Sequence, residues 1–321
     1  MIMKIFRALF LYLKLFRWQN LLIITLTMFL VRYGILMPLL ESRGVDMLMP
    51  LYDFILLVVA ILILAAAGYV INDYYDTDID EINRPERKIL GKQIPLKNAF
   101  PLFYTMVIAA ILIGTYLSFM AGSIRLGFIF VVMALVLYYY SLKYKRLPFA
   151  GNFTVALLSA FPVGLVWLFE FFYLKKDVLV FAEMIGYFKT INTMVLAYFV
   201  FAFLVSLIRE MVKDLEDVEG DREAGCRTLP IAFGITVMKK WILALSLLIL
   251  VALGWAAYSL FTREQMPVAW YFSVVIGALW IYYLILLVKA KEKKDYHFIS
   301  TILKIVIIAG VLSMQLLFME F

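Results

Sequence analysis

The chain alternates long apolar runs with short polar segments from one end to the other. Each run has about 20 residues, which is the length that a helix needs to cross the hydrocarbon layer of a membrane. Nine runs occur, at 21–40, 53–71, 101–121, 124–142, 153–173, 190–208, 241–261, 268–288 and 298–319. The pattern predicts an all-α polytopic membrane protein with about nine transmembrane helices.

The composition agrees with this fold class and limits the partners. Of the 321 residues, 65% are hydrophobic and 17% are charged, whereas soluble domains are about 45–50% apolar and about 25% charged. One cysteine, Cys226, excludes an internal disulfide, and one histidine, His297, argues against a histidine-rich metal centre. The net charge of +7 is accounted for by the loops that flank the helices, so we expect the bilayer as a partner and no nucleic acid.

The polar segments differ in charge in a way that sets the orientation. Segments 4–17, 81–100, 143–146, 209–240 and 289–294 carry 22 Lys and Arg residues, whereas the intervening loops carry six. Because loops rich in Lys and Arg stay on the cytoplasmic side, the N-terminus is expected in the cytoplasm and the C-terminus outside.

The whole chain, 1–321, reads as a single transmembrane domain with three special parts. Residues 1–19 combine Lys and Arg on one helical face with apolar residues elsewhere, which predicts an amphipathic helix at the membrane surface. Segments 81–98 and 218–238 are long and carry glycine and proline. They are expected to leave the helical pattern and to form caps over the cytoplasmic mouth of the helix bundle.

An acidic segment directly follows the second apolar run. Residues 72–80 read Asn-Asp-Tyr-Tyr-Asp-Thr-Asp-Ile-Asp. On a helix, Asp73, Asp76 and Asp80 would share one face, at positions i, i+3 and i+7, while Asp78 would point away.

A second acidic helix end follows the sixth run. Asp214, Asp217 and Asp221 would share one face, with Glu210 one turn earlier. Clustered carboxylates repel one another unless a cation lies between them. Both clusters are expected on the cytoplasmic side, so the pattern favours Mg²⁺ and a phosphate-bearing substrate at the membrane surface.

Three motifs together resemble a known family. Asn72 to Asp80 reads NDxxDxxxD, Asp217 to Asp221 reads DxxxD, and Tyr139 to Lys143 reads YxxxK. Their order and their expected side of the membrane are similar to those of the UbiA-type intramembrane prenyltransferases. The resemblance covers essentially the whole chain.

The resemblance implies a Mg²⁺-dependent prenyltransferase that uses a prenyl diphosphate donor. It implies that Asp73, Asp76, Asp217 and Asp221 are catalytic and that Asn72, Tyr139 and Lys143 bind the diphosphate. Arg17 and Asn20 resemble the Arg-x-x-Asn at the start of the family's first helix and are further substrate-binding candidates. The expected metal ligands are the two sets of aspartates that share a face: Asp73, Asp76, Asp80, Asp214, Asp217 and Asp221.

The resemblance implies an acceptor that is a hydrophobic or phosphorylated small molecule. The segment 209–230 is similar to the subgroup that transfers a geranylgeranyl group to geranylgeranylglyceryl phosphate in ether-lipid synthesis. The alternatives are an aromatic acceptor such as 4-hydroxybenzoate or a naphthoate, a cation or phosphate transporter, and a CDP-alcohol phosphotransferase. The expected location is a prokaryotic inner membrane, with the active site facing the cytoplasm.

Three polar residues keep two interpretations each. Arg32 lies in the middle of the first apolar run and is either functional or paired with a structural partner. Asn152 is either a helix start or a ligand contact. Glu210 is either part of the site or only an ion-pair partner of the neighbouring Arg209 and Lys213.

Overall fold

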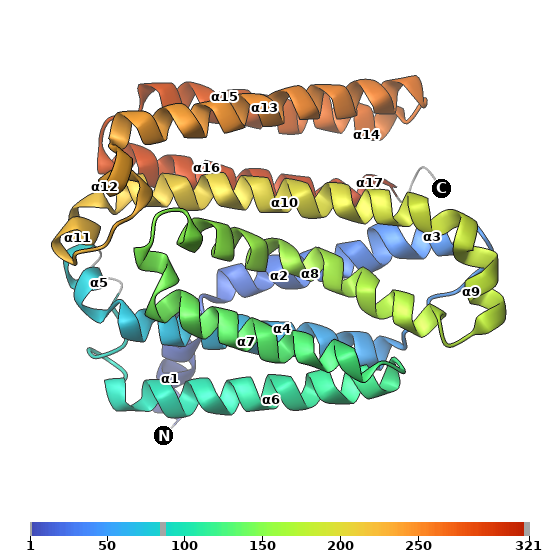
Figure 1. Ribbon diagram of the computed structural model, residues 1–321, viewed down its shortest axis with the longest axis horizontal. Helices are drawn as coiled ribbons and strands as arrows, with labels where there is room; N and C mark the ends of the chain where they lie inside the picture. The colour runs from blue at the N-terminus through green and yellow to red at the C-terminus, as the bar shows by residue number, and fades with distance from the viewer. Residues whose placement is uncertain (1, 84–87, 318–321) are drawn as a thin grey trace.

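The structure is a computed structural model that describes residues 2–83 and 88–317. The side chains of residues 2–8, 80, 82 and 83 lie outside this description. Within the described ranges the chain forms helices and turns and no β-strand. The long helices run side by side along the long axis of the molecule (Figure 1).

The helical elements follow the alternation of the sequence. They are α1 (Ile2–Leu15), α2 (Trp18–Leu30), η1 (Val31–Leu36), α3 (Met37–Glu41), α4 (Leu51–Tyr75), α5 (Thr77–Asn83), η2 (Leu96–Asn98), α6 (Ala99–Met120), η3 (Ile124–Leu126), α7 (Gly127–Leu142), η4 (Tyr144–Arg146), α8 (Ala150–Leu174), α9 (Val178–Met184), η5 (Ile185–Tyr187), α10 (Phe188–Glu216), α11 (Val218–Glu223), α12 (Leu229–Phe233), α13 (Ile235–Thr262), α14 (Met266–Trp270), η6 (Tyr271–Ile276), α15 (Gly277–Lys289), α16 (Lys293–Leu312) and α17 (Met314–Leu317).

The described residues contain nine helical stretches that are long and apolar enough to cross a membrane, which confirms the predicted fold class. Each predicted run falls on one of them, and residues 318 and 319 of the last run lie outside the described residues. The largest difference is at the sixth run, predicted at 190–208, which lies within a helical stretch from Val178 to Glu216. The apolar pattern stops at Arg209, but the helix continues for two more turns, and these turns carry cavity-lining charges.

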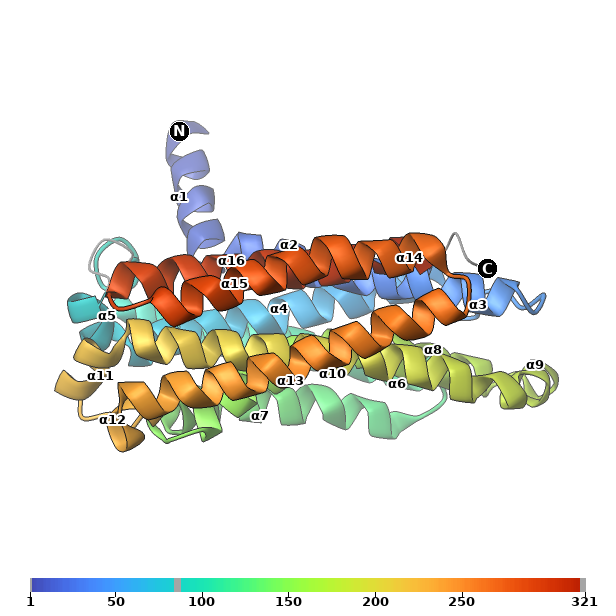
Figure 2. The same ribbon diagram turned by 90° about the horizontal axis from the view of Figure 1, so that it is seen from above.

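The N-terminal helix α1 lies across the direction of the long helices and projects from the side of the bundle (Figure 2). The chain changes direction at Arg17, which has the left-handed backbone conformation with φ of 51°. This direction is compatible with a helix lying in the plane of the membrane surface, and the surface location remains a prediction.

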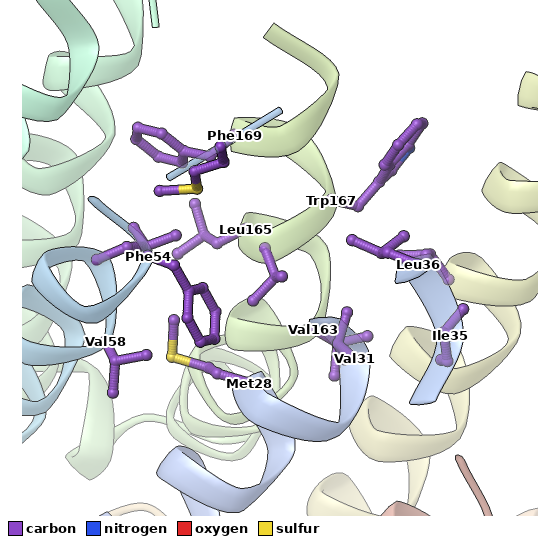
Figure 3. Packing of buried hydrophobic residues seen from close by; sticks show 14 of the residues in the cluster. Met28, Val31, Ile35, Leu36, Phe54, Val58, Val163, Leu165, Trp167 and Phe169 are labelled. Atoms are coloured by element: carbon purple, nitrogen blue, oxygen red, sulfur yellow. The ribbon is translucent and has the colours of Figure 1, made fainter. Parts of the chain in front are cut away.

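A dense apolar core joins α2, η1, α4 and α8 in one half of the bundle. Met28 and Val31 pack against Phe54 of α4 and against Val163 and Leu165 of α8 (Figure 3). Val163 also lines the cavity described below, so the cavity ends where this packing begins.

Both acidic helices end at the same end of the bundle. The last full turn of α4 reaches Tyr75 and that of α10 reaches Glu216, and the short helices α5 and α11 that follow them pack against each other (Figure 1). The segment 218–238 was expected to leave the helical pattern. It instead contains α11, α12 and the first turn of α13, and it leaves the helical pattern at residues 224–228, around Gly225, and at Gly234, where both glycines have positive φ.

Candidate active site

A cavity of about 360 Å³ opens at the end of the bundle where α4 and α10 end. Its inner wall is mostly apolar, and its aspartates lie toward the opening. The apolar wall comes from α2, α4, α7, α8 and α16 and includes Ile23, Ile24, Ile61, Leu64, Leu137, Leu158, Val163, Ile307 and Val311. A ligand with a charged head and a hydrocarbon tail fits this division of the surface.

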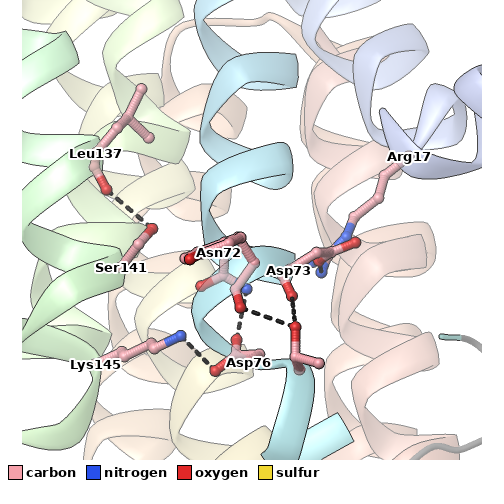
Figure 4. A network of polar contacts seen from close by, with 9 residues as sticks. Arg17, Asn72, Asp73, Asp76, Leu137, Ser141 and Lys145 are labelled. Carbon is pink, nitrogen blue, oxygen red and sulfur yellow. Dashed lines mark hydrogen bonds and ion pairs between the residues drawn. The ribbon is translucent and has the colours of Figure 1, made fainter. Parts of the chain in front are cut away.

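The end of α4 contributes Asn72 and Asp76 to the charged part. The Asn72 amide Nδ2 donates a hydrogen bond of 2.7 Å to the Asp76 carboxylate, and Lys145 forms an ion pair with the other carboxylate oxygen (Figure 4). These contacts come from two elements, the last turn of α4 and the η4 turn after α7, so they tie the two ends together.

Asp73 lies one turn earlier on α4 but points elsewhere. The Arg17 guanidinium donates a hydrogen bond of 2.7 Å to its carboxylate. Arg17 also lies over the Tyr69 ring, 4.8 Å from the ring centroid, and lines the cavity, whereas Asp73 is not among the lining residues. Asp73 and Asp76, which were predicted to share one face, therefore point in different directions, and only Asp76 lines the cavity. The side chain of Asp80 lies outside the described part of the chain.

The end of α10 and the start of α11 contribute Asp214, Asp217 and Asp221, and all three line the same cavity as Asp76. Asn152 of α8 donates a hydrogen bond of 3.0 Å from its Nδ2 to the Asp214 carboxylate. The two acidic helix ends predicted from the sequence therefore meet, and Asn152 contacts this group as well as lying near a helix start.

Burial and the neighbouring carboxylates Asp217 and Asp76 raise the pKa of Asp221 to about 7. Like charges held together in a partly desolvated place favour either protonation or a bound cation. The arrangement can therefore accept a cation in exchange for a proton.

The residues fit Mg²⁺ as a shared site and not as a closed cage. Among the described residues, no three His, Cys, Asp or Glu side chains are grouped so that they could hold a metal ion by themselves. Mg²⁺ usually takes one or two carboxylates and completes its shell with water and phosphate oxygens. The Asn72 Oδ1 atom is buried beside Asp76 without a hydrogen-bond partner in the described part, so it is a further oxygen donor of the right kind.

Tyr139 and Lys143, the two residues of the YxxxK motif that the resemblance named, do not line the cavity. Tyr139 is 47% exposed and stacks near Tyr144, and Lys143 is exposed. Tyr140 and Lys145 line the cavity in their place. The reason is that α7 presents Met133, Leu137 and Tyr140 on one face and ends at Leu142, so that the η4 turn directs Lys145 inward.

Gly151 allows Lys145 to come this close. A Cβ atom at Gly151 would lie 2.9 Å from the Lys145 Cα and 3.1 Å from the Tyr144 carbonyl oxygen. The preceding Phe149 has φ of 65°, an uncommon value for a bulky residue that a tightly packed turn can hold. The start of α8 and the η4 turn therefore form one compact unit.

A separate group of charges lies deeper in the cavity, on α10 and α16. Arg209 and Lys213 both pair with Glu210, at 3.2 Å and 2.6 Å. Lys304 donates a hydrogen bond of 2.9 Å to the Asn20 amide oxygen. Arg209, Lys213 and Lys304 line the cavity but were not identified as site residues from the sequence. A lysine inside an apolar run, as Lys304 is, was the available signal.

Arg32 has a structural partner at the opposite end of the bundle. Its guanidinium donates a hydrogen bond of 2.7 Å to the Met49 carbonyl and lies 3.8 Å from the Glu170 carboxylate. Glu170 also accepts hydrogen bonds from the backbone N–H groups of Leu48 and Met49. These contacts hold the loop before α4 and are not part of the cavity.

Known proteins resemble this chain in sequence. The UbiA prenyltransferase family matches residues 39–305 of the chain. The digeranylgeranylglyceryl phosphate synthase of Methanosphaera stadtmanae is 32% identical over 256 residues, which are 79% of this chain and 84% of that protein.

Solved structures share the fold. A structure described as a digeranylgeranylglyceryl phosphate synthase in membranes superposes with a TM-score of 0.59 at 26% identity, over 98% of this chain and 100% of that one. A UbiA homologue from Archaeoglobus fulgidus bound to DMAPP and Mg²⁺ superposes with a TM-score of 0.53 at 17% identity, over 94% and 98% of the two chains.

Proposed function

The chain belongs to the UbiA prenyltransferase family, and from that premise we propose that it transfers a polyprenyl group from a prenyl diphosphate to geranylgeranylglyceryl phosphate. The observation that carries the proposal is the meeting of the two acidic helix ends at the charged mouth of one apolar cavity. The family membership sets aside the transporter and the CDP-alcohol phosphotransferase as alternatives. The name of the relative from Methanosphaera stadtmanae supports the lipid acceptor over an aromatic one.

The donor is proposed to bind with its diphosphate at the mouth and its hydrocarbon tail along the apolar wall. Mg²⁺ would be held by Asp76 and Asn72 on one side and by Asp214, Asp217 and Asp221 on the other, where it would neutralise the diphosphate. Asp73 would act by orienting Arg17, to which it is bonded. Asp80 is also proposed as a metal ligand, and its side chain lies outside the described part of the chain.

Cations of the chain would stabilise the leaving group. When the bond between donor carbon C1 and the diphosphate oxygen breaks, negative charge grows on the diphosphate. Lys145 and Arg17 lie at the mouth where that charge develops. We assign to Lys145 and Tyr140 the diphosphate contacts that the resemblance gave to Lys143 and Tyr139.

The second half of the reaction forms the ether. The acceptor hydroxyl oxygen bonds to donor C1, and the hydroxyl proton is released. The apolar wall keeps water away from the allylic cation, so that the acceptor and not water captures it. Asn20, beside Tyr69 and Lys304, would contact the acceptor.

The setting of the reaction is part of the proposal. The protein is an integral membrane protein by its helices and its family. The distribution of Lys and Arg supports an active site that faces the cytoplasm of a prokaryotic cell, with α1 on the membrane surface. The packed helices α5 and α11 would cover the mouth.

The test uses the purified protein in detergent with labelled geranylgeranyl diphosphate and Mg²⁺. Geranylgeranylglyceryl phosphate and 4-hydroxybenzoate are offered in parallel. We expect labelled product with the lipid acceptor only, and a loss of at least about 100-fold in rate for Asp217→Asn. Asp78→Asn is the matched control because its side chain is exposed, and it is expected to keep the wild-type rate.

Two results would contradict the proposal. Product with 4-hydroxybenzoate alone would assign the chain to the aromatic branch of acceptors. Equal activity of Asp217→Asn and the wild type would mean that the acidic cavity mouth is not the catalytic site.

A further inference from the structure

The cavity holds a second cationic group that the donor diphosphate does not explain. At the mouth, Lys145 pairs with Asp76 and Arg17 pairs with Asp73. Deeper, Arg209 and Lys213 share the single carboxylate of Glu210. Lys304 donates to the neutral amide of Asn20, and no carboxylate in the described part of the chain lies within ion-pair distance of it.

The charge of this deeper group is unbalanced. Lys213 forms the shorter of the two contacts with Glu210, at 2.6 Å, and lies beside Asp214 nearer the mouth, so the two cations below it, Arg209 and Lys304, are left with a formal charge of +2. The nearby Asp214 accepts its hydrogen bond from Asn152 and belongs to the acidic group at the mouth. A phosphate monoester carries about −1.5 to −2 at neutral pH, so it would complete the balance.

The deeper group also lies at a useful distance from the mouth. Helices α10 and α16 pack against each other, with His297 bonded to Glu216 at the end of α10 and Arg209 bonded to the Ser300 carbonyl. Arg209 lies seven residues before Glu216, and Lys304 lies seven residues after His297. At a rise of 1.5 Å per residue both are roughly 10 Å below the helix end.

We infer that Arg209 and Lys304 form a subsite for the phosphate of the acceptor, separate from the diphosphate site at the mouth. The inference rests on the proposed function and names the residues that would select a phosphorylated acceptor. In geranylgeranylglyceryl phosphate the free hydroxyl is on the carbon next to the one that carries the phosphate. A phosphate on Lys304 therefore keeps the hydroxyl within a few ångströms, on the side of the donor carbon that reacts.

The wall beside this subsite suits the rest of the acceptor. Ile307 and Val311 follow Lys304 at one and two turns on the same face of α16, and both line the cavity. Asn20 fixes the Lys304 ammonium group through its amide oxygen. A lipid whose phosphate binds Lys304 can extend its hydrocarbon chain over this apolar stripe.

The experiment compares two acceptors that differ only in the phosphate, geranylgeranylglyceryl phosphate and geranylgeranylglycerol. For each, kcat/KM is measured at saturating geranylgeranyl diphosphate and Mg²⁺. We expect Lys304→Met to reduce the preference for the phosphorylated acceptor about 10- to 100-fold, the effect of losing one charge-assisted hydrogen bond. The KM for the donor should stay at its wild-type value.

Two further variants separate the charge from the fold. Lys304→Arg keeps the charge and is expected to retain most of the preference. Lys294→Met removes a lysine of the same helix whose side chain is 80% exposed. It should leave kcat/KM unchanged for both acceptors. If Lys304→Met fails to fold, inorganic phosphate is tested on the wild type, where it should compete with the phosphorylated acceptor and not with the donor.

Four outcomes overturn the inference. An unchanged acceptor preference in folded Lys304→Met would do so while leaving the proposed function intact, and so would a raised donor KM with the same preference. In the fallback assay, inorganic phosphate competing with the donor would assign the subsite to the diphosphate. A wild type that prenylates neither lipid would remove the proposed function itself, and the inference with it.

Discussion

Lys145 lies between the acidic end of α4 and the first turn of α8, with its ammonium group on the Asp76 carboxylate. Its side chain is 9% exposed, whereas Lys143 two residues earlier is exposed. A cation that is held still in a partly desolvated place stabilises a developing anion without reorganising, which an exposed lysine cannot do.

We therefore predict different effects for the two lysines. Lys145→Gln should lower kcat by about 100-fold, the usual cost of losing one preorganised contact to a developing charge. Lys143→Gln should stay within about twofold of the wild type, because an exposed side chain contributes little. Steady-state rates with saturating donor and acceptor measure both variants, and the reverse order would restore the assignment to Lys143.

The pKa of Asp221, raised to about 7, gives a second prediction at this scale. Below that pH the carboxyl is protonated, and a cation must displace the proton to bind. We expect the affinity for Mg²⁺ to fall up to about tenfold per pH unit below about 7 and to be nearly constant above about 8. Calorimetric titration of Mg²⁺ into the protein at pH 6, 7 and 8 measures this.

Asp221→Asn provides the comparison for that titration. It should bind Mg²⁺ more weakly at pH 8 and lose the pH dependence between 6 and 8. The exposed Asp78→Asn should keep the wild-type dependence. A wild-type affinity that does not change with pH would show that Asp221 is not a metal contact.

The acidic residues were predictable at the residue scale because carboxylates directly after an apolar run stand out. Lys145 and Tyr140 were not predictable, because the YxxxK motif gives the spacing of two residues and does not tell which side chains of the helix point into the cavity. The face that α7 turns to the cavity depends on its packing against α4 and α8. Lys304 and Arg209 could be recognised as neighbours only from the antiparallel packing of α10 against α16, two segments that are far apart in the sequence.

At the scale of elements, the η4 turn and the start of α8 act as one unit because Gly151 lets their backbones touch. A methyl group there would meet backbone atoms, which cannot rotate away as a side chain can. Gly151→Ala should therefore move Lys145 out of the cavity.

We expect Gly151→Ala to reduce kcat at least about tenfold and to destabilise the protein by about 1–3 kcal/mol, the usual range for overpacking. Gly186→Ala is the matched control, because a Cβ there would meet nothing within 4 Å. Thermal unfolding in detergent and steady-state rates measure the two effects. A fully active and stable Gly151→Ala would mean that the turn adapts without moving Lys145.

The helices themselves were the most predictable elements, since a continuous apolar run of sufficient length has few other structures in a membrane. The ends were less predictable. The last two turns of α10 are charged and look like loop in the apolar pattern, yet they stay helical because their charges pair with one another and with α8. The segment 218–238 looks like loop for the same reason and contains α11 and α12.

At the scale of the whole molecule, two of the charged groups among the described residues lie at opposite ends of the bundle. One is the cavity mouth, and the other is the buried group of Arg32 and Glu170 at the far end, with Tyr173 donating a hydrogen bond of 2.7 Å to Asp53 nearby. The second group ties the loop before α4 to α8. The sequence indicated Arg32 as unusual, but the partner is 138 positions away and could be found only in the fold.

The meeting of both acidic ends was predictable at this scale from topology alone. Two segments that follow spans with the same direction must lie on the same side of a membrane. Topology does not predict that the two acidic segments line one cavity, which depends on the packing of α5 against α11.

The continuous apolar wall below the charged mouth has a kinetic consequence. In the proposed reaction, a lipid tail leaves the hydrocarbon layer of the membrane only to enter the apolar cavity. The concentrations of the proposed donor and acceptor would therefore be counted per area of membrane and not per volume of water. Adding inert phospholipid to vesicles at a fixed total amount of substrate would lower the mole fraction of substrate in the bilayer and would slow turnover. The natural measure of saturation for this protein is therefore a mole fraction, and a KM in molar units describes the vesicle as much as the enzyme.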